Sequence, residues 1–147
     1  MGDKDIKLAK FRLNNVYVKS CNYSQEIPKK SSTAKPSFVI DIQPKGKVCS
    51  GSKEFQLELN VTIKEKKERF VGTFLVIGLF EFSFELNEES WATVGEYFYL
   101  NSSAILFPYV RAFIANMTAQ SGIETVHIPT LNLTSLKERL KENILIE

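Results

Sequence analysis

The chain has 147 residues, of which 44% are hydrophobic and 24% charged, and its 19 basic residues nearly balance 17 acidic ones. This length fits a single domain over residues 1–147, and the balanced charge argues against a dedicated nucleic-acid binder. No apolar run reaches the roughly 18 residues that a membrane span requires, which predicts no membrane insertion. Eleven Phe, five Tyr and one Trp indicate either an apolar binding surface or a core rich in phenylalanine.

The N-terminal region has no segment that resembles a targeting signal. Residues 1–10 are charged and aperiodic, which predicts a frayed end, and the first eleven residues contain no continuous apolar segment of the signal-peptide kind. We therefore expect a cytoplasmic chain whose two cysteines, Cys21 and Cys49, are reduced.

The first part of the chain shows the period-two pattern of β-strands. Apolar residues alternate over residues 11–18, with a slip at Asn14-Asn15 that predicts a bulge. The polar segment from Ser20 to Lys35 is predicted as a long loop. A second strand is predicted over Ser37–Gln43, where apolar residues alternate again.

A long hairpin and a short helix are predicted next. The alternation is clearest over Glu54–Lys64, and Arg69–Glu85 returns antiparallel to it as the second arm. Asn87, followed by two glutamates, has the pattern of a helix N-cap. We expect a short helix from this residue, before the main helix.

The main helix is predicted within Asn101–Ser121, which is apolar at nearly every position from Ile105 to Met117. Pro108 fits the first helical turn, so we expect the straight helix to begin near Phe107 and to end at Gly122. The face predicted to lie on the protein's own sheet consists of Leu106, Tyr109, Val110, Phe113 and Met117.

The opposite face of this helix carries mainly small residues, which allow a second element to approach closely. It consists of Ile105, Ala112, Ala115 and Ala119. Because the chain is short, we expect another copy of the protein to cover this face, which makes these residues the predicted oligomer interface.

The last part of the chain is predicted as a flap and a helix. Residues 123–131 have no clear period but carry apolar side chains, which predicts a flap on apolar surface. Asn132 or Ser135 caps a last helix, whose apolar stripe is Leu133, Leu136, Leu140 and Ile144. Strands followed by helices predict the α+β class.

The residues that carry catalysis are sparse in this sequence. His127 is the single histidine, and no cysteine or carboxylate follows it at the spacing of a metal site or a catalytic triad. We therefore expect no enzymatic activity, no metal and no cofactor. A small-molecule-binding or enzymatic α+β domain would need a closed pocket with converging polar groups, which the sequence does not indicate.

Apolar residues from three segments could line a groove for an extended apolar peptide. This predicted groove consists of Phe38, Ile40, Ile42, Phe113, Met117, Ile123, Val126, Ile128 and Leu131. The pattern alone equally allows that all of these residues are core.

The motif Ile-Leu-Phe-Pro-Tyr-Val-Arg over residues 105–111, followed by a Pro-x-Leu-Asn-Leu motif over residues 129–133, resembles the SecB family of protein-export chaperones. The similarity extends to Val16-Tyr17-Val18-Lys19, to Ile40-Asp41-Ile42 and to Gly78-Leu79-Phe80, and it covers nearly the whole chain in the same order.

This resemblance implies a four-stranded antiparallel sheet with two main helices packed on one face. It implies a homotetramer, a dimer of dimers, with the long helices between the sheets. It further implies an ATP-independent holdase that binds unfolded or precursor polypeptides for export. The client groove would be bounded by Ser20–Lys35 and Gly122–Leu131.

Two departures from the family pattern concern the translocation motor SecA, which docks on acidic residues of the outer sheet surface. Ser20, Ser24 and Thr73 stand at the expected positions, and the chain is slightly basic with a net charge of +2. These departures argue against SecA docking and leave client binding unaffected. The alternative is a dedicated chaperone for the antitoxin of a toxin–antitoxin pair or for another single client.

Overall fold

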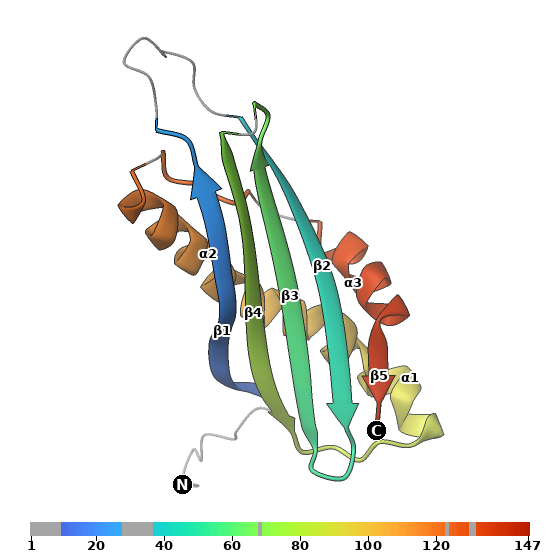
Figure 1. Ribbon diagram of the computed structural model, residues 1–147. Coiled ribbons are helices and arrows are strands. Elements are labelled where there is room, and N and C mark those ends of the chain that lie inside the picture. Colours follow the sequence, from blue (N-terminus) through green and yellow to red (C-terminus); the bar gives the residue numbers. More distant parts are fainter. Residues whose placement is uncertain (1–9, 28–36, 68, 123, 130–131) are drawn as a thin grey trace, which may run out of the picture.

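The computed structural model describes residues 10–27, 37–67, 69–122, 124–129 and 132–147. The order of elements is β1 (Phe11–Gln25), β2 (Phe38–Cys49), β3 (Glu54–Glu65), β4 (Phe70–Phe82), α1 (Glu88–Glu96), a π-helical turn η1 (Tyr97–Asn101), α2 (Ser102–Gln120), α3 (Leu133–Glu142) and β5 (Ile144–Ile146). Figure 1 shows one layer of strands with the helices on one face, so the predicted α+β fold is confirmed. Lys10 is the one described residue of the predicted frayed end.

The five-stranded sheet has the strand order β1-β4-β3-β2-β5. The four long strands are antiparallel, whereas β5 pairs in parallel with β2. The sequence did not predict β5, because Ile144 continues the apolar stripe of the last helix. The helix instead ends at Glu142, and Ile144 lies beside Gly46 of β2.

β1 is longer than the alternation of apolar residues predicted. Its pairing with β4 continues to Gln25, which lies opposite Phe70, so the prediction of a loop from Ser20 is wrong for Ser20–Gln25. Register shifts occur between Leu13 and Asn15 and again between Val18 and Ser20, and the first confirms the predicted bulge. The rest of that predicted loop lies mainly outside the described residues.

The predicted cap at Asn87 is confirmed. Its side chain accepts the N–H of Ser90 at 2.7 Å, and the Ser90 hydroxyl accepts the N–H of Asn87 at 2.9 Å. α1 does not end in a loop but continues through η1, in which the N–H of Ser102 donates to the carbonyl of Tyr97. This wide turn joins α1 to α2 and buries Phe98 completely.

α2 begins at Ser102, so the prediction that Pro108 stands in the first turn is wrong. Pro108 lies inside the helix and has no N–H to donate to the carbonyl of Ala104. Both residues are exposed. Water can therefore satisfy that carbonyl, and the proline is tolerated. The predicted end is confirmed, because Gly122 follows the helix with φ of +85°.

The inward face of α2 is rotated from its predicted position. Leu106 and Val110 are buried as predicted, but Tyr109 is 54% exposed, and Phe113 and Met117 are only half-buried. Ile114 and Thr118 complete the buried face instead.

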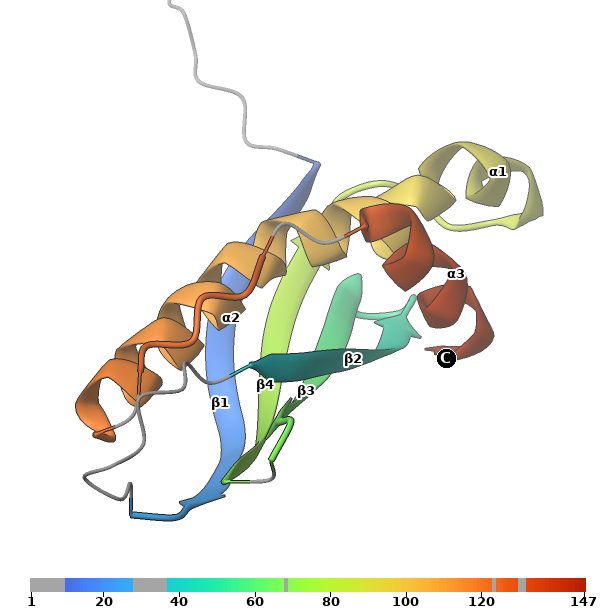
Figure 2. The same cartoon turned by 90° about the horizontal axis from the view of Figure 1, so that it is seen from above.

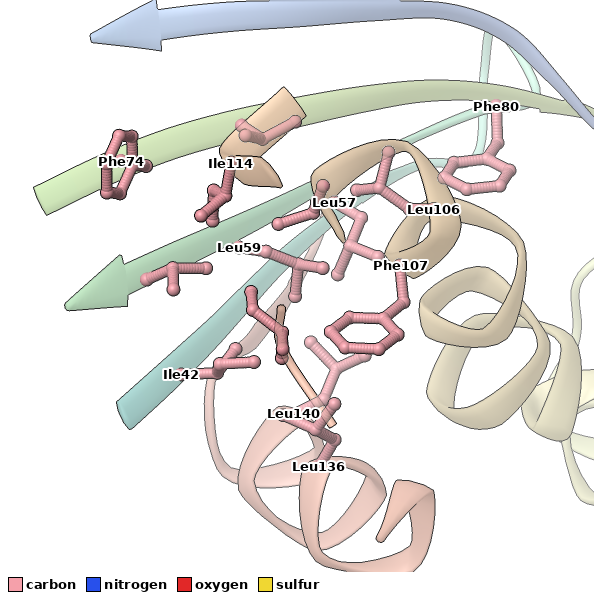
Figure 3. Close-up of a cluster of buried hydrophobic side chains, with 14 of the residues drawn as sticks. Ile42, Leu57, Leu59, Phe74, Phe80, Leu106, Phe107, Ile114, Leu136 and Leu140 are labelled. Carbon is pink, nitrogen blue, oxygen red and sulfur yellow. The ribbon is translucent and has the colours of Figure 1, made fainter. Parts of the chain in front are cut away.

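The core lies between the sheet and the helices. Figure 3 shows side chains of both layers pointing toward one another, among them Ile42, Leu57, Leu59, Phe74 and Phe80 from the sheet and Leu106, Phe107, Ile114, Leu136 and Leu140 from the helices. Among the described residues, no helix lies on the other face of the sheet (Figure 2). None of the helices in the described ranges is both long and apolar enough to cross a membrane.

Candidate functional site

A partly open apolar cluster lies at the end of the sheet where β2 begins and α2 ends. Four predicted groove residues, Phe38, Ile40, Phe113 and Met117, are half-buried there. The ring of Phe38 packs edge-on against Phe70 at a centroid distance of 6.1 Å, and that of Phe113 packs edge-on against Phe74 at 6.3 Å. Both therefore rest on the aromatic residues of β4 and keep part of their surface open.

Three other predicted groove residues are core residues. Ile42 is 4% exposed, Val126 is 2% and Ile128 is 1%, so these side chains offer no surface to a client. Ile42 points from β2 toward the helices (Figure 3). We correct the predicted lining accordingly. Ile123 and Leu131 lie outside the described residues.

The segment 124–129 is held against α2 by Thr118, a residue that sequence reasoning did not identify. The hydroxyl of Thr118 donates to the carbonyl of Ile114 at 2.8 Å and accepts the N–H of Val126 at 2.8 Å. Figure 2 shows this segment running along the helix. The described part of the predicted flap therefore lies on α2. The signal that could have indicated this contact is the polar Thr118 within the apolar face of the helix.

Tyr23 is the second residue that the sequence analysis missed. It extends the cluster onto β1, where its ring stacks on Phe70 at 5.8 Å and remains 40% exposed. The signal was the alternation of Cys21, Tyr23 and Gln25, which share the helix-facing side of β1 beyond the second bulge.

An ion pair between the buried Glu65 and the partly exposed Arg69 closes this end of the sheet. Glu65 lies opposite Phe38 on the helix-facing side, and its side chain is 3% exposed. It accepts hydrogen bonds from the Arg69 guanidinium, the shortest at 2.9 Å, and from the N–H groups of Arg69 and Lys67. The Arg69 guanidinium is the main reason that the pKa of Glu65 falls to about 2. The carboxylate therefore stays charged and fixes the β3–β4 turn.

The first half of β2 presents a free backbone edge beside the cluster. The carbonyl of Ser37 accepts the N–H of Lys66, whereas the N–H of Gly46 points the other way, to Asn143. Because backbone groups alternate along a strand, those of Phe38 and Ile40 point away from β3. No described strand pairs with them there. The site therefore combines free hydrogen-bonding groups with half-buried apolar side chains.

The residues of the predicted oligomer interface lie on α2. Ile105 and Ala115 are half-buried, and Ala112 and Ala119 are exposed. Ala112 and Ala115 also line a surface pocket of about 330 Å³ with His127 and Ile128 of the neighbouring segment. Whether a second copy covers this face stays a prediction.

Metal-binding side chains do not gather in the described part of the chain: no group of three or more His, Cys, Asp or Glu could hold an ion there. His127 lies beside α2 with Pro108 and Arg111. What the described geometry supports is binding of an extended chain by apolar contact and backbone pairing.

Comparison with known proteins identifies the family. The family described as preprotein translocase subunit SecB matches residues 4–143. The chain belongs to the SecB family. The protein-export protein SecB of Alcanivorax borkumensis is 23% identical over 141 residues, which cover 90% of this chain and 86% of that protein. An uncharacterised protein of Methanocaldococcus jannaschii is 30% identical over 133 residues, covering 89% and 84%.

The fold of SecB proteins is also found in a solved structure. The Mycobacterium tuberculosis SecB-like chaperone Rv1957, in complex with a ChAD peptide from the HigA1 antitoxin, superposes with a TM-score of 0.69 at 12% identity. The match covers 83% of this chain and 91% of that one.

The three residues that the SecB resemblance placed on the outer sheet surface share one face of the sheet by register. They are Ser20, Ser24 and Thr73.

Proposed function

We propose that this SecB-family protein is an ATP-independent holdase, which binds unfolded or precursor polypeptides without chemical change. The observation that carries the proposal is the free edge of β2 beside the half-buried side chains of Phe38, Ile40, Phe113 and Met117. An extended client would add a strand at this edge and bury its own apolar side chains in the cluster.

This mode of binding tolerates many client sequences. The hydrogen bonds at the edge involve the client backbone, which is the same in every polypeptide, and aromatic and methionine side chains adapt to different apolar partners. The one buried charge of the cluster, Glu65, is already neutralised by Arg69. The site therefore selects for extended, apolar chain rather than for one sequence.

We propose that the protein assembles as a homotetramer through the α2 face that contains Ile105, Ala112, Ala115 and Ala119. This face supports the proposal because its residues are uncharged, three of the four are alanine, and all keep some exposed surface. Ala115→Glu would place a charge within a close helix contact, so we expect light scattering to show dissociation. Retention of a tetramer by this variant would exclude this face.

We place the activity in the cytoplasm, with a role in export that does not depend on SecA. The family and the Alcanivorax relative support an export role. Ser20, Ser24 and Thr73 leave the three expected docking positions on the outer sheet face uncharged, which argues against SecA docking at these positions.

The second candidate function is that of a dedicated chaperone for an antitoxin. It is favoured by the fold of the M. tuberculosis chaperone, which is bound to an antitoxin peptide. Affinity purification from the native cell separates the two functions. A general holdase would retain many unfolded proteins, whereas a dedicated chaperone would retain one dominant partner.

The holdase function is tested by suppression of the aggregation of chemically denatured citrate synthase without nucleotide. Ile40→Pro removes the outward N–H of the edge and the side chain, whereas Ile40→Ala removes only the side chain. We expect wild-type protein to suppress aggregation and Ile40→Pro to do so less well than Ile40→Ala. No suppression by the folded wild-type protein at several-fold excess would contradict the proposal.

A further inference from the structure

β5 covers only the second half of the β2 edge. Ile144 pairs with Gly46 and Ile146 with Val48. The N–H of Gly46 donates to the carbonyl of Asn143 at 3.0 Å, and the carbonyl of Val48 accepts the N–H of Glu147 at 2.8 Å. These groups belong to the same row as the free groups of Phe38 and Ile40. In the described part of the chain, this row is thus occupied by β5 and Asn143 in its second half, whereas in its first half only the carbonyl of Ile42 is bound, by Arg139.

We propose that β5 is a displaceable strap that competes with a client polypeptide for the edge of β2. When the strap is released, outward groups of Gly46 and Val48 join those of Phe38 and Ile40 as available parts of the edge. This inference rests on the proposed holdase function, because it assigns a regulatory element to the same binding edge.

The packing of β5 is weak enough for displacement. The strand has three residues, and Leu145 and Ile146 are 54% and 53% exposed. Ile146 does not enter the core but lines an open pocket of about 440 Å³ together with Leu86 and Trp91. Of the three residues, only Ile144 packs against the core cluster. Short elements with few buried contacts open at low free-energy cost.

The polar contacts that tie the strap down are also exposed. The ion pair between Lys47 and Glu147 has a distance of 3.3 Å and joins side chains that are 44% and 55% exposed. The hydroxyl and the N–H of Ser50 donate to the carbonyl of Glu147 at 2.7 and 2.9 Å. Water can replace such contacts readily, so they contribute little to holding β5.

α3 is anchored independently of β5. Leu140 is completely buried and Leu136 is 4% exposed. Arg139 donates to the carbonyl of Ile42 at 2.7 Å and to the Asp41 carboxylate at 3.1 Å. The strap can therefore leave β2 by rotation near Asn143, the C-cap of α3, while the helix stays in place.

Release of the strap would add a defined set of groups to the edge. The outward carbonyl of Gly46 and the outward groups of Val48 become available, whereas the carbonyl of Ile42 stays bound to Arg139 and Pro44 supplies a carbonyl but no N–H. A client that extends past Ile42 and Pro44 would lose one hydrogen bond at each of them and then pair with Gly46 and Val48.

The test uses a truncation that ends at Asn143 and a matched pair of proline variants. In the alternating ladder the N–H of Leu145 points toward β2 and that of Ile146 points away. Leu145→Pro therefore detaches the strap, and Ile146→Pro leaves its pairing intact. The probe is fluorescein-labelled, reduced and carboxymethylated α-lactalbumin, a chain that stays unfolded.

We expect the truncated protein and Leu145→Pro to bind the probe about three- to tenfold more tightly than wild type, and Ile146→Pro to match wild type. Hydrogen exchange measured by NMR should show the Val48 amide unprotected in the truncated protein and protected again when the probe is added, whereas the Gly46 amide keeps its acceptor at Asn143. In the wild-type protein, the probe should accelerate exchange at Leu145 and Glu147, a readout that needs no variant.

The outcomes separate the two proposals. If wild-type protein does not bind the probe, the holdase function fails. If it binds, but exchange at Leu145 and Glu147 is unchanged and the release variants bind no more tightly, the strap is overturned and the function stands.

Discussion

Phenylalanine side chains lie at both ends of the sheet but are packed differently at each. At one end Phe11, Phe55 and Phe98 pack together with centroid distances of 5.1 to 6.3 Å and are almost completely buried. At the other end Phe38 and Phe113 contact β4 on one side and keep exposed surface on the other. The closed end therefore stabilises the fold, and the open end retains apolar surface for binding.

The largest expected effect is at the closed end. Phe98→Ala should lower the free energy of unfolding by about 3–5 kcal/mol, because it leaves a cavity among several buried rings. Urea unfolding followed by circular dichroism measures this loss. A loss below about 1 kcal/mol would show that the closed end is no better packed than the open one.

At the open end, the next effect is expected at the buried carboxylate. Because the pKa of Glu65 is lowered from 4.5 to about 2, its contribution to stability is complete above pH 4.5 and is lost as the pH falls toward 2. Glu65→Gln should be less stable than wild type at pH 7, and the difference should shrink over that range. The midpoints of urea unfolding between pH 2 and 7 measure this difference in stability, and Glu54→Gln, at an exposed position, is the control. A difference that stays constant over this pH range would contradict the prediction.

Thr118→Val should have a smaller effect, because it removes the hydroxyl that accepts the N–H of Val126 and preserves the side-chain shape. A buried N–H without a partner costs about 1–3 kcal/mol. Urea unfolding should show this loss, and hydrogen exchange at Val126 should accelerate. Thr62→Val, on the uncovered face of the sheet, is the control; equal behaviour of the two variants would mean that segment 124–129 is not held by Thr118.

The smallest effect on stability is expected at Phe113. Because this ring is only half-buried, Phe113→Ala should cost about 1 kcal/mol of unfolding free energy. The affinity of this variant for an unfolded client should also fall about fivefold, because the exposed part of the ring is lost. Val39→Ala is the control, since that residue is 57% exposed on the opposite face of β2. Unchanged binding by Phe113→Ala would remove this ring from the site.

Local chemistry made part of this structure predictable. The alternation over Glu54–Lys64 predicted β3 almost to its ends, because one face is buried and the other is wet. The cap at Asn87 and the helix end at Gly122 depend on neighbouring backbone groups and were also predicted correctly. The family resemblance, carried by the motif of residues 105–111, supplied the arrangement of these elements.

Features that depend on distant contacts could not be predicted. Pro108 is accepted inside α2 because its surroundings are exposed, and the propensity of proline alone indicated a helix start. The burial of Val126 and Ile128 depends on their contact with α2, since their segment has no period. Tyr23 joins the open end because of a second bulge in β1, which polar neighbours concealed.

The wide turn at residues 97–101 acts as a spacer of fixed length between two helices that serve opposite ends of the sheet. Each residue of a helix rotates the side chains that follow by about 100°. Loss of one residue here would turn Phe113 away from Phe74 and bring a different set of side chains onto the strands. The length of this junction therefore fixes which face of α2 meets the sheet.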